Sequence, residues 1–301
     1  MAQSQLKTKR DGRDWPFQVK PLHPVLGCEI TGITLEQAVS PAMFAKVYEA
    51  FLDYELILFR DVELPPPLQV AFARNFGEVN IHVLSQYHGY GHPEIYMLTN
   101  KTPEGKPTGK HPDRGTLFWH TDGSWKERTG QATMMYSEEL PPPGEGGETQ
   151  FADMYAGYEM LPADIKKKIE GKNGSLRAIH NFTFSRRRRH GEDPLTAKQS
   201  AEVPPVAHPI VRTHPETGRK AIFLGDHAEY IEGMPYDEGR ALIEEINVLV
   251  TPPSNYYSHI WKPRECMVWD NRCTLHRATG FDETQYIRVM RRCTITGDRP
   301  V

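Results

Sequence analysis

Apolar residues in the first quarter of the chain recur at spacings that predict two helices separated by one buried strand. Ser40 and Pro41 begin the first helix as N-cap and first helical residue, and apolar positions follow at helical spacing up to Phe51. The second helix is predicted over residues 68–76 and ends before a glycine. Residues 54–60 are apolar and flanked by charge, which is typical of a buried strand.

Beyond the second helix, short apolar runs alternate with Pro, Gly and Asn turns, and helices are predicted at residues 162–169 and 237–250. Many short strands joined by turns favour a β-sandwich or barrel. No internal repeat or linker divides the chain, so we predict a mobile arm over residues 1–16 and a single domain over residues 17–301. The predicted strands are Glu94–Leu98, Thr116–Trp119, Ala132–Ser137, Ala221–Leu224, Cys266–Trp269 and Val289–Ile295.

The composition is that of a folded globular protein, with 38% hydrophobic and 25% charged residues. Its apolar runs are too short for a membrane helix, and the N-terminus lacks the apolar core of a signal peptide. A net charge of −3 gives no reason to expect nucleic-acid binding. The four cysteines form no CxxC pair, so we predict a reduced, cytoplasmic protein rather than a zinc ribbon or a disulfide scaffold.

Six histidines are followed two residues later by a carboxylate, a pattern that places both side chains on one face of an extended segment. Three of these pairs contain a central proline, and a fourth lies in a highly charged stretch. We therefore predict that four of the histidines face solvent in loops. These are His92, His111, His190 and His214.

Two pairs remain as candidate metal ligands, because each follows a predicted strand: His120 with Asp122, and His227 with Glu229. The residues alone favour the first pair only modestly. His276 is the best candidate for a third ligand, although a buried core histidine would fit that position equally well. Two histidines and one carboxylate leave open positions on a metal, as in the non-haem Fe(II) oxygenases.

Five segments in a fixed order make the chain recognisable. It resembles the taurine dioxygenase and dichlorophenoxyacetate dioxygenase family of Fe(II)- and 2-oxoglutarate-dependent oxygenases, from about Phe17 to Pro300. The resemblance implies a mainly β fold with flanking helices, built on a double-stranded β-helix (a jelly-roll, cupin-like core). It also implies that His120, Asp122 and His276 bind the iron and that His227 does not. The segments are Trp119–Asp122, Pro143–Met154, His208–Pro215, Trp269–Arg272 and Arg288–Arg292.

The same resemblance implies the residues that bind the co-substrate. Arg288, twelve residues beyond His276, and Thr149 match the family positions that hold the distal carboxylate of 2-oxoglutarate. The planar guanidinium suits a carboxylate because it donates two parallel hydrogen bonds. The implied reaction consumes O2, hydroxylates a small anionic organic substrate and releases succinate and CO2. Ascorbate is expected to stimulate it.

The implied substrate residues are Arg292 and, by a weaker match, His82. On a strand Arg292 shares a face with Arg288, whereas Arg291 points away. The taurine enzymes have an asparagine where this chain has Thr116. That departure favours a carboxylate such as an aryloxyalkanoate, whose hydroxylation would cleave the ether through a hemiacetal, over an alkylsulfonate.

Two other functions are compatible with the same ligands. One is a zinc hydrolase with a metal-bound water, which gives Arg288 and Thr149 no role. The other is an inactive jelly-roll that binds a small anion. The run Arg186–Arg189 is interpreted first as a solvated loop and second as a mobile lid that attracts an anionic substrate. Relatives in the family also suggest a homodimer or homotetramer.

Overall fold

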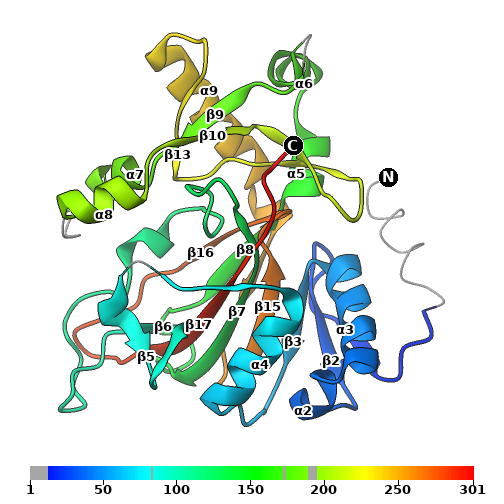
Figure 1. Cartoon of the computed structure of the whole chain (residues 1–301), viewed down its shortest axis with the longest axis vertical. Helices are drawn as coiled ribbons and strands as arrows, with labels where there is room; N and C mark the ends of the chain where they lie inside the picture. Colours follow the sequence, from blue (N-terminus) through cyan, green and yellow to red (C-terminus); the bar gives the residue numbers. More distant parts are fainter. Residues whose placement is uncertain (1–12, 83, 172–173, 189–194) are drawn as a thin grey trace.

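The computed structural model describes residues 13–82, 84–171, 174–188 and 195–301 (Figure 1). Most of the predicted N-terminal arm, residues 1–12, lies outside the described residues. Within the described ranges, no helix combines the length and apolar character that a membrane span requires.

The N-terminal part confirms both predicted helices and the strand between them. Helix α3 begins at Pro41, but the Ser40 hydroxyl donates to the carbonyl of Gln37 instead of capping the helix. Helix α4 begins before the predicted start, because prolines fit a first turn whose N–H groups have no helical partner. The elements are β1 (Gln18–Pro21), β2 (Cys28–Thr31), α2 (Leu35–Ala38), α3 (Pro41–Tyr54), β3 (Leu56–Phe59) and α4 (Pro66–Phe76).

The largest sheet has nine strands in the order β1-β2-β3-β15-β7-β17-β6-β5, with β4 paired to β17. Helices α3 and α4 cover one of its faces (Figure 1). Phe51, Phe72 and Phe76 pack edge to face in that layer, at centroid separations of 5.2 and 5.5 Å. The further strands are β4 (Val79–Asn80), β5 (His88–Gly89), β6 (His92–Thr99), β7 (Gly130–Glu139), β15 (Cys266–Asp270) and β17 (Val289–Thr296).

A second sheet, in the order β14-β8-β16, packs against the other face of the large sheet. Phe151 of the small sheet meets Trp269 of the large sheet at a centroid separation of 5.2 Å. Two facing antiparallel sheets agree with the sandwich that the sequence predicts. The small sheet consists of β8 (Thr149–Asp153), β14 (Tyr256–His259) and β16 (Thr274–Ala278).

Residues between β8 and β14 form a third layer, drawn at the top of Figure 1, and its apolar core also includes Ala152 and Leu275 of the small sheet. We call residues 154–255 the insertion. It contains the sheet β10-β9-β13 and the hairpin β11-β12. Its strands are β9 (Arg177–His180), β10 (Val206–Pro209), β11 (Val211–Thr213), β12 (Lys220–Ile222) and β13 (Ala228–Ile231). Its helices are α5 (Met154–Met160), α6 (Ala163–Glu170), α7 (Phe182–Arg188), α8 (Ala197–Glu202), α9 (Tyr236–Val250) and the short η3 (Pro253–Asn255).

The predicted strand at Thr116–Trp119 is wrong. Residues Arg114–Leu117 form a short 3₁₀ helix, η2; another, η1, spans Ser85–Tyr87. The reason is local, because Asp113 accepts a hydrogen bond from the Gly115 N–H at 2.9 Å and the Thr116 hydroxyl donates to the Asp113 carbonyl at 2.7 Å. Such side-chain bonds to the backbone stabilise a turn at the expense of a strand.

The prediction of four solvent-facing histidines is also wrong where the structure tests it. His92 is half-buried and begins β6, and His111 and His214 are buried. His190 lies outside the described residues. The Nδ1 atom of His214 accepts two backbone hydrogen bonds within the β11-β12 hairpin, and its Nε2 lies 3.1 Å from Asp270. These partners allow a loop histidine to be buried.

Asp270, at the end of β15, is the centre of a buried charge network. Arg272 contacts both of its carboxylate oxygens, at 2.9 and 2.7 Å, and also pairs with Glu216. Burial alone would raise the pKa of Asp270, but Arg272 and His214 outweigh it and hold that pKa below the usual range. The network ties the insertion to the large sheet.

We expect Asp270→Asn to lower the free energy of unfolding by about 3–5 kcal/mol, because it leaves the buried Arg272 without its main counter-charge. Urea denaturation measures the loss. Arg299→Gln is the matched control, since it removes an exposed ion pair with Glu127 of 3.1 Å, and exposed pairs contribute less than about 1 kcal/mol. Equal losses in the two variants would contradict the assigned importance of the network.

Candidate metal and substrate site

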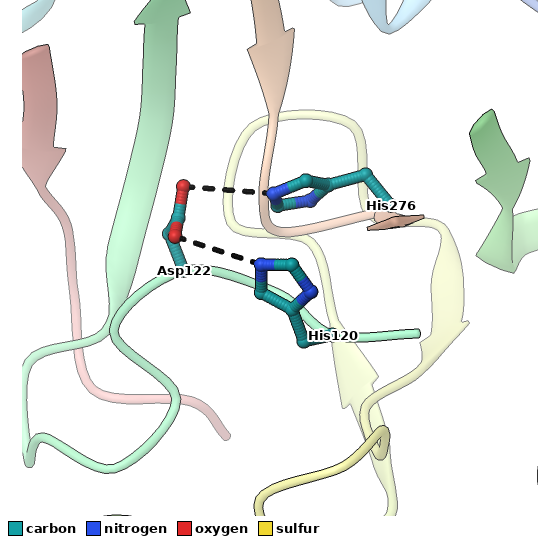
Figure 2. A group of neighbouring side chains, drawn as sticks. All are labelled: His120, Asp122 and His276. Atoms are coloured by element: carbon teal, nitrogen blue, oxygen red, sulfur yellow. Dashed lines mark ion pairs between the residues drawn. The ribbon is translucent and has the colours of Figure 1, made fainter. Parts of the chain in front are cut away.

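Three side chains from two segments of the chain point toward one another (Figure 2). His120 and Asp122 lie between η2 and β7, and His276 is the middle residue of β16. The backbones of the two histidines bond to each other: the His120 N–H donates to the His276 carbonyl at 3.0 Å, and the reverse bond is 2.8 Å. This bridge fixes a segment of the chain that precedes β7 against a strand of the small sheet.

The ligand atoms surround a common point. The Nε2 atoms of His120 and His276 lie 4.0 and 3.7 Å from the two carboxylate oxygens of Asp122. A divalent metal with bonds of about 2.1 Å can join ligand atoms up to about 4.2 Å apart. All three residues are buried, and one ligand atom from each lies within 4.8 Å of the others. The spacing therefore fits one shared metal ion.

The protonation states also fit a metal ion. The Nδ1 atom of His120 lies 2.7 Å from the Phe118 carbonyl, so the proton is on Nδ1 and the lone pair of Nε2 faces Asp122. Burial, with the nearby His120, keeps the pKa of His276 well below its usual value, so this imidazole is neutral. Neutral imidazoles beside an ionised carboxylate form the donor set that ferrous iron takes in non-haem oxygenases.

Asp122 is ionised although it is buried. Burial alone would raise its pKa, but the cation of Arg292, with Nη1 at 3.2 Å from Oδ1, and the two histidines lower it below the usual range. The Thr133 hydroxyl adds a hydrogen bond of 2.6 Å to the other oxygen. The carboxylate is thus oriented by groups on β7 and β17.

Gly225 lets the insertion pass close to the metal ligands. Its φ of +106° lies in the region that favours glycine. A β-carbon at this position would lie 2.9 Å from the Trp119 carbonyl oxygen and 3.1 Å from Cα of His120. A larger residue would therefore displace the segment that carries His120.

A second group of polar side chains surrounds Arg288, the residue before β17. Arg288 is buried, and its Nε has no hydrogen-bond partner among the described residues. Burial lowers its pKa to about 10, although Glu148 opposes this shift. Its backbone N–H donates to the side chain of Asn100 at 2.7 Å. A buried cation with an unsatisfied donor is suited to an anionic ligand.

Gly147, two residues before Thr149 at the start of β8, lies next to Arg288, since a β-carbon at Gly147 would be 3.7 Å from Arg288 Cδ. The indole N–H of Trp261 donates to the Thr149 hydroxyl oxygen at 2.9 Å. An indole only donates, so the hydroxyl proton is left to donate elsewhere. The sequence around Trp261 carries no local signal of this contact, because Thr149 is 112 residues away.

A cavity opens beside His120 and Asp122. Arg292 and His82, both predicted to bind substrate, line it, and so does Thr116. The sequence analysis did not assign Tyr96, whose ring lies 4.8 Å from the Arg292 guanidinium, because an alternating strand pattern does not reveal which aromatic residue faces a cavity. Other lining residues come from the insertion or precede β7: Trp125, Phe182, Arg186 and His227.

His227, the rival candidate ligand, and Arg291, the rival of Arg292, both lie outside the positions predicted for the metal and substrate residues. The His227 ring lies 6.2 Å from that of His120, and its Nδ1 is 3.1 Å from the Ser124 hydroxyl, so His227 lines the cavity without joining the three ligand atoms. Arg291 points to the opposite face from Arg292, with its guanidinium 4.5 Å from the Tyr136 ring and its Nε 3.1 Å from Glu138. Strand parity thus separates the two arginines as predicted.

The fold and the site define the class, a jelly-roll protein with a two-histidine, one-carboxylate centre. Comparison with known proteins defines the family: the family described as taurine catabolism dioxygenase TauD, TfdA matches residues 18–294, so this chain belongs to it. The protein is therefore an Fe(II)- and 2-oxoglutarate-dependent dioxygenase. This agrees with the predicted enzyme and cofactors and not with the zinc hydrolase or the inactive jelly-roll.

Individual relatives cover nearly the whole chain. It is 34% identical to the alpha-ketoglutarate-dependent 2,4-dichlorophenoxyacetate dioxygenase of Burkholderia sp. (strain RASC), over 92% of this chain and 94% of that protein. It is 31% identical to the (S)-phenoxypropionate/alpha-ketoglutarate-dioxygenase of Sphingobium herbicidovorans, over 94% of this chain and 96% of that protein. The crystal structure of AAD-2 with Mn(II) and N-oxalylglycine superposes with a TM-score of 0.81 at 30% identity, covering 94% of this chain and 98% of that one. The predicted jelly-roll fold is confirmed.

We expect Gly225→Ala to weaken Mn(II) binding about tenfold or more, because the added methyl group displaces the backbone next to His120. Titration calorimetry on the metal-free protein measures the affinity. Gly233→Ala is the control: its φ of +76° imposes similar backbone strain, but a β-carbon there meets no atom within 4 Å. If Gly225→Ala binds Mn(II) as tightly as Gly233→Ala, the packing of Gly225 does not position His120.

Proposed function

We propose that this dioxygenase acts on an aryloxyalkanoate and hydroxylates the carbon beside the ether oxygen. The observation that carries the proposal is a cavity next to the three ligand residues that combines guanidinium groups with aromatic walls. Such a cavity is complementary to an aromatic ring that bears a carboxylate. The relatives named for 2,4-dichlorophenoxyacetate and (S)-phenoxypropionate support the same substrate class.

His120, Asp122 and His276 would hold the ferrous ion. The iron, together with 2-oxoglutarate and O2, supplies the oxidising power that hydroxylates a C–H bond. The chain itself keeps Asp122 ionised through Arg292 and Thr133, keeps the His276 imidazole neutral by burial, and orients His120 through the Phe118 carbonyl. The protein thus supplies a preformed donor set, which is worth more than one that must assemble on binding.

Arg288 and Thr149 would bind the distal carboxylate of 2-oxoglutarate. The unsatisfied Nε of Arg288 and the free proton of the Thr149 hydroxyl both need an acceptor, and a carboxylate provides one for each. Arg288 lies next to Gly147 and is not among the residues that line the substrate cavity, whereas Arg292 is one of them. The distal carboxylate of 2-oxoglutarate and the carboxylate of the substrate would therefore bind different cations.

Arg292 and His82 would contact the substrate. Burial, reinforced by the cation of Arg292, lowers the pKa of His82 to about 3, so its imidazole is neutral and acts through hydrogen bonds rather than charge. Hydroxylation beside the ether oxygen would give a hemiacetal, which breaks into a phenol and a carbonyl acid. The ether bond would thus be cleaved by a single hydroxylation.

The carboxylate is preferred over an alkylsulfonate because of Thr116. In this structure the Thr116 hydroxyl donates to the Asp113 carbonyl within the turn at 2.7 Å, so it does not offer its proton to a sulfonate. A cytoplasmic location and a dimeric or tetrameric state remain predictions, and light scattering on the purified protein tests the second.

The deciding experiment is turnover of phenoxyacetate with Fe(II), 2-oxoglutarate, ascorbate and O2. We expect phenol and succinate in equal amounts, and little succinate above background with an alkylsulfonate. His276→Ala should abolish both products, because it removes one of three ligands. Succinate formation driven by a sulfonate and not by phenoxyacetate would overturn the proposed substrate class while leaving the reaction class in place.

We expect Arg288→Gln to raise the KM for 2-oxoglutarate about 100-fold, because a buried charge-assisted pair with a carboxylate is lost. The KM for phenoxyacetate should change by less than about threefold. Lys101→Gln, which removes an exposed ion pair with Glu139, is the control and should behave as the wild type. A parallel rise in both KM values would contradict separate carboxylate sites.

A further inference from the structure

The charged residues around the substrate cavity are not equivalent. Two of the described residues that line the cavity carry a guanidinium cation, Arg186 and Arg292. Arg292 belongs to a central strand of the large sheet, donates to Asp122 at 3.2 Å and stacks on Tyr96. Its charge is therefore shared with a metal-ligand carboxylate before any substrate arrives.

Arg186 reaches the cavity from a different element, helix α7 of the insertion. The start of α7 is fixed, because the Asn181 N–H donates to the His227 carbonyl at 2.8 Å and the Asn181 side chain accepts from the Phe184 N–H at 3.1 Å. Phe182 then stacks on Trp125 at a centroid separation of 4.5 Å. These contacts place the first turn of α7 against the cavity.

The three described arginines of the run point in different directions, as successive helical residues do at about 100° apart. Arg187 is exposed. Arg188 lies over Phe184 and 3.7 Å from Glu244, away from the cavity. Arg186 is half-buried, packs its guanidinium 5.7 Å from the Phe182 ring and lines the cavity. Arg189 lies outside the described residues.

We propose that Arg186 is a specificity-determining residue that joins Arg292 in binding the anionic group of the substrate, while the ring stacks on the surface formed by Trp125, Phe182 and His227. This deepens, and rests on, the proposed function of the same cavity. The described arginines of the run lie on a helix and not in the predicted loop; Arg187 faces solvent as that interpretation requires, and Arg186 does not. A guanidinium beside an aromatic wall recognises a carboxylate and the ring attached to it together. Asp113 also lines the cavity, and its side chain caps η2. Its negative charge disfavours a substrate carboxylate placed directly beside it.

The test is a binding measurement that needs no turnover. The full chain is loaded with Mn(II) and 2-oxoglutarate, and phenoxyacetate and its neutral analogue phenoxyacetamide are titrated by calorimetry. We expect Arg186→Gln to weaken phenoxyacetate binding about 10- to 100-fold and to change phenoxyacetamide binding less than about twofold. Arg186→Lys should fall between, because it keeps the charge and loses the planar fork.

Arg187→Gln is the matched control, since it removes an adjacent arginine of the same helix that faces solvent, and it should bind both probes as the wild type does. Unchanged Mn(II) affinity and melting temperature in Arg186→Gln show that the variant is folded. Wild-type affinity of Arg186→Gln for phenoxyacetate, or an equal loss for both probes, would overturn the assignment of Arg186.

Failure of this inference is distinguishable from failure of the proposed function. Phenoxyacetate turnover that Arg186→Gln leaves unchanged would overturn the role of Arg186 and keep the function. If the wild type binds an alkylsulfonate or benzoate instead, and Arg186→Gln weakens that binding, the anion site is supported and the aryloxyalkanoate substrate is overturned. A wild type that binds none of these probes would overturn both.

Discussion

A single buried negative charge, the carboxylate of Asp122, organises the centre of this protein. A carboxylate without partners would be too costly to bury. Here a hydroxyl from β7, a guanidinium from β17 and two imidazoles surround it. The partners come from both sheets of the sandwich, so the geometry of the centre depends on how the sheets pack. The Trp269–Phe151 contact between the sheets lies next to His276 and helps to hold it in place.

The end of the chain shows how one strand can distribute several cations. Arg288, Arg291 and Arg292 lie within five residues, yet each faces a different environment. Alternation along β17 sends Arg291 to Glu138 and Tyr136 on one face and Arg292 to Asp122 on the other. Arg288, just before the strand, has no such partner for its Nε among the described residues. The strand thus provides one cation that pairs with Glu138 and one that pairs with Asp122 beside the cavity.

Local patterns predicted much of this arrangement. The α3 and α4 helices, the buried β3 strand and the parity of Arg291 and Arg292 all follow from spacing along a few residues. The same reasoning failed for Thr116–Trp119, where side-chain bonds to the backbone favour a turn that an apolar count does not reveal. It failed for His214 because the burial depends on Asp270, 56 residues away. His276 was the best candidate for a third ligand from the residues, but only the family resemblance distinguished it from a buried core histidine, since the backbone bridge to His120 depends on tertiary packing.

The two facing sheets and the insertion contribute different residues to the site. The ligand residues and Arg288 lie on or next to strands of the two facing sheets, where a substitution would disturb the packing that holds the centre. Phe182, Arg186 and His227 belong to the insertion, which reaches the centre through contacts such as Gly225 against His120. Among these residues, Phe182 and Arg186 line the cavity without belonging to the cluster of His120, Asp122 and His276. A fold built in this way can keep one oxidative chemistry and vary the acid that it accepts.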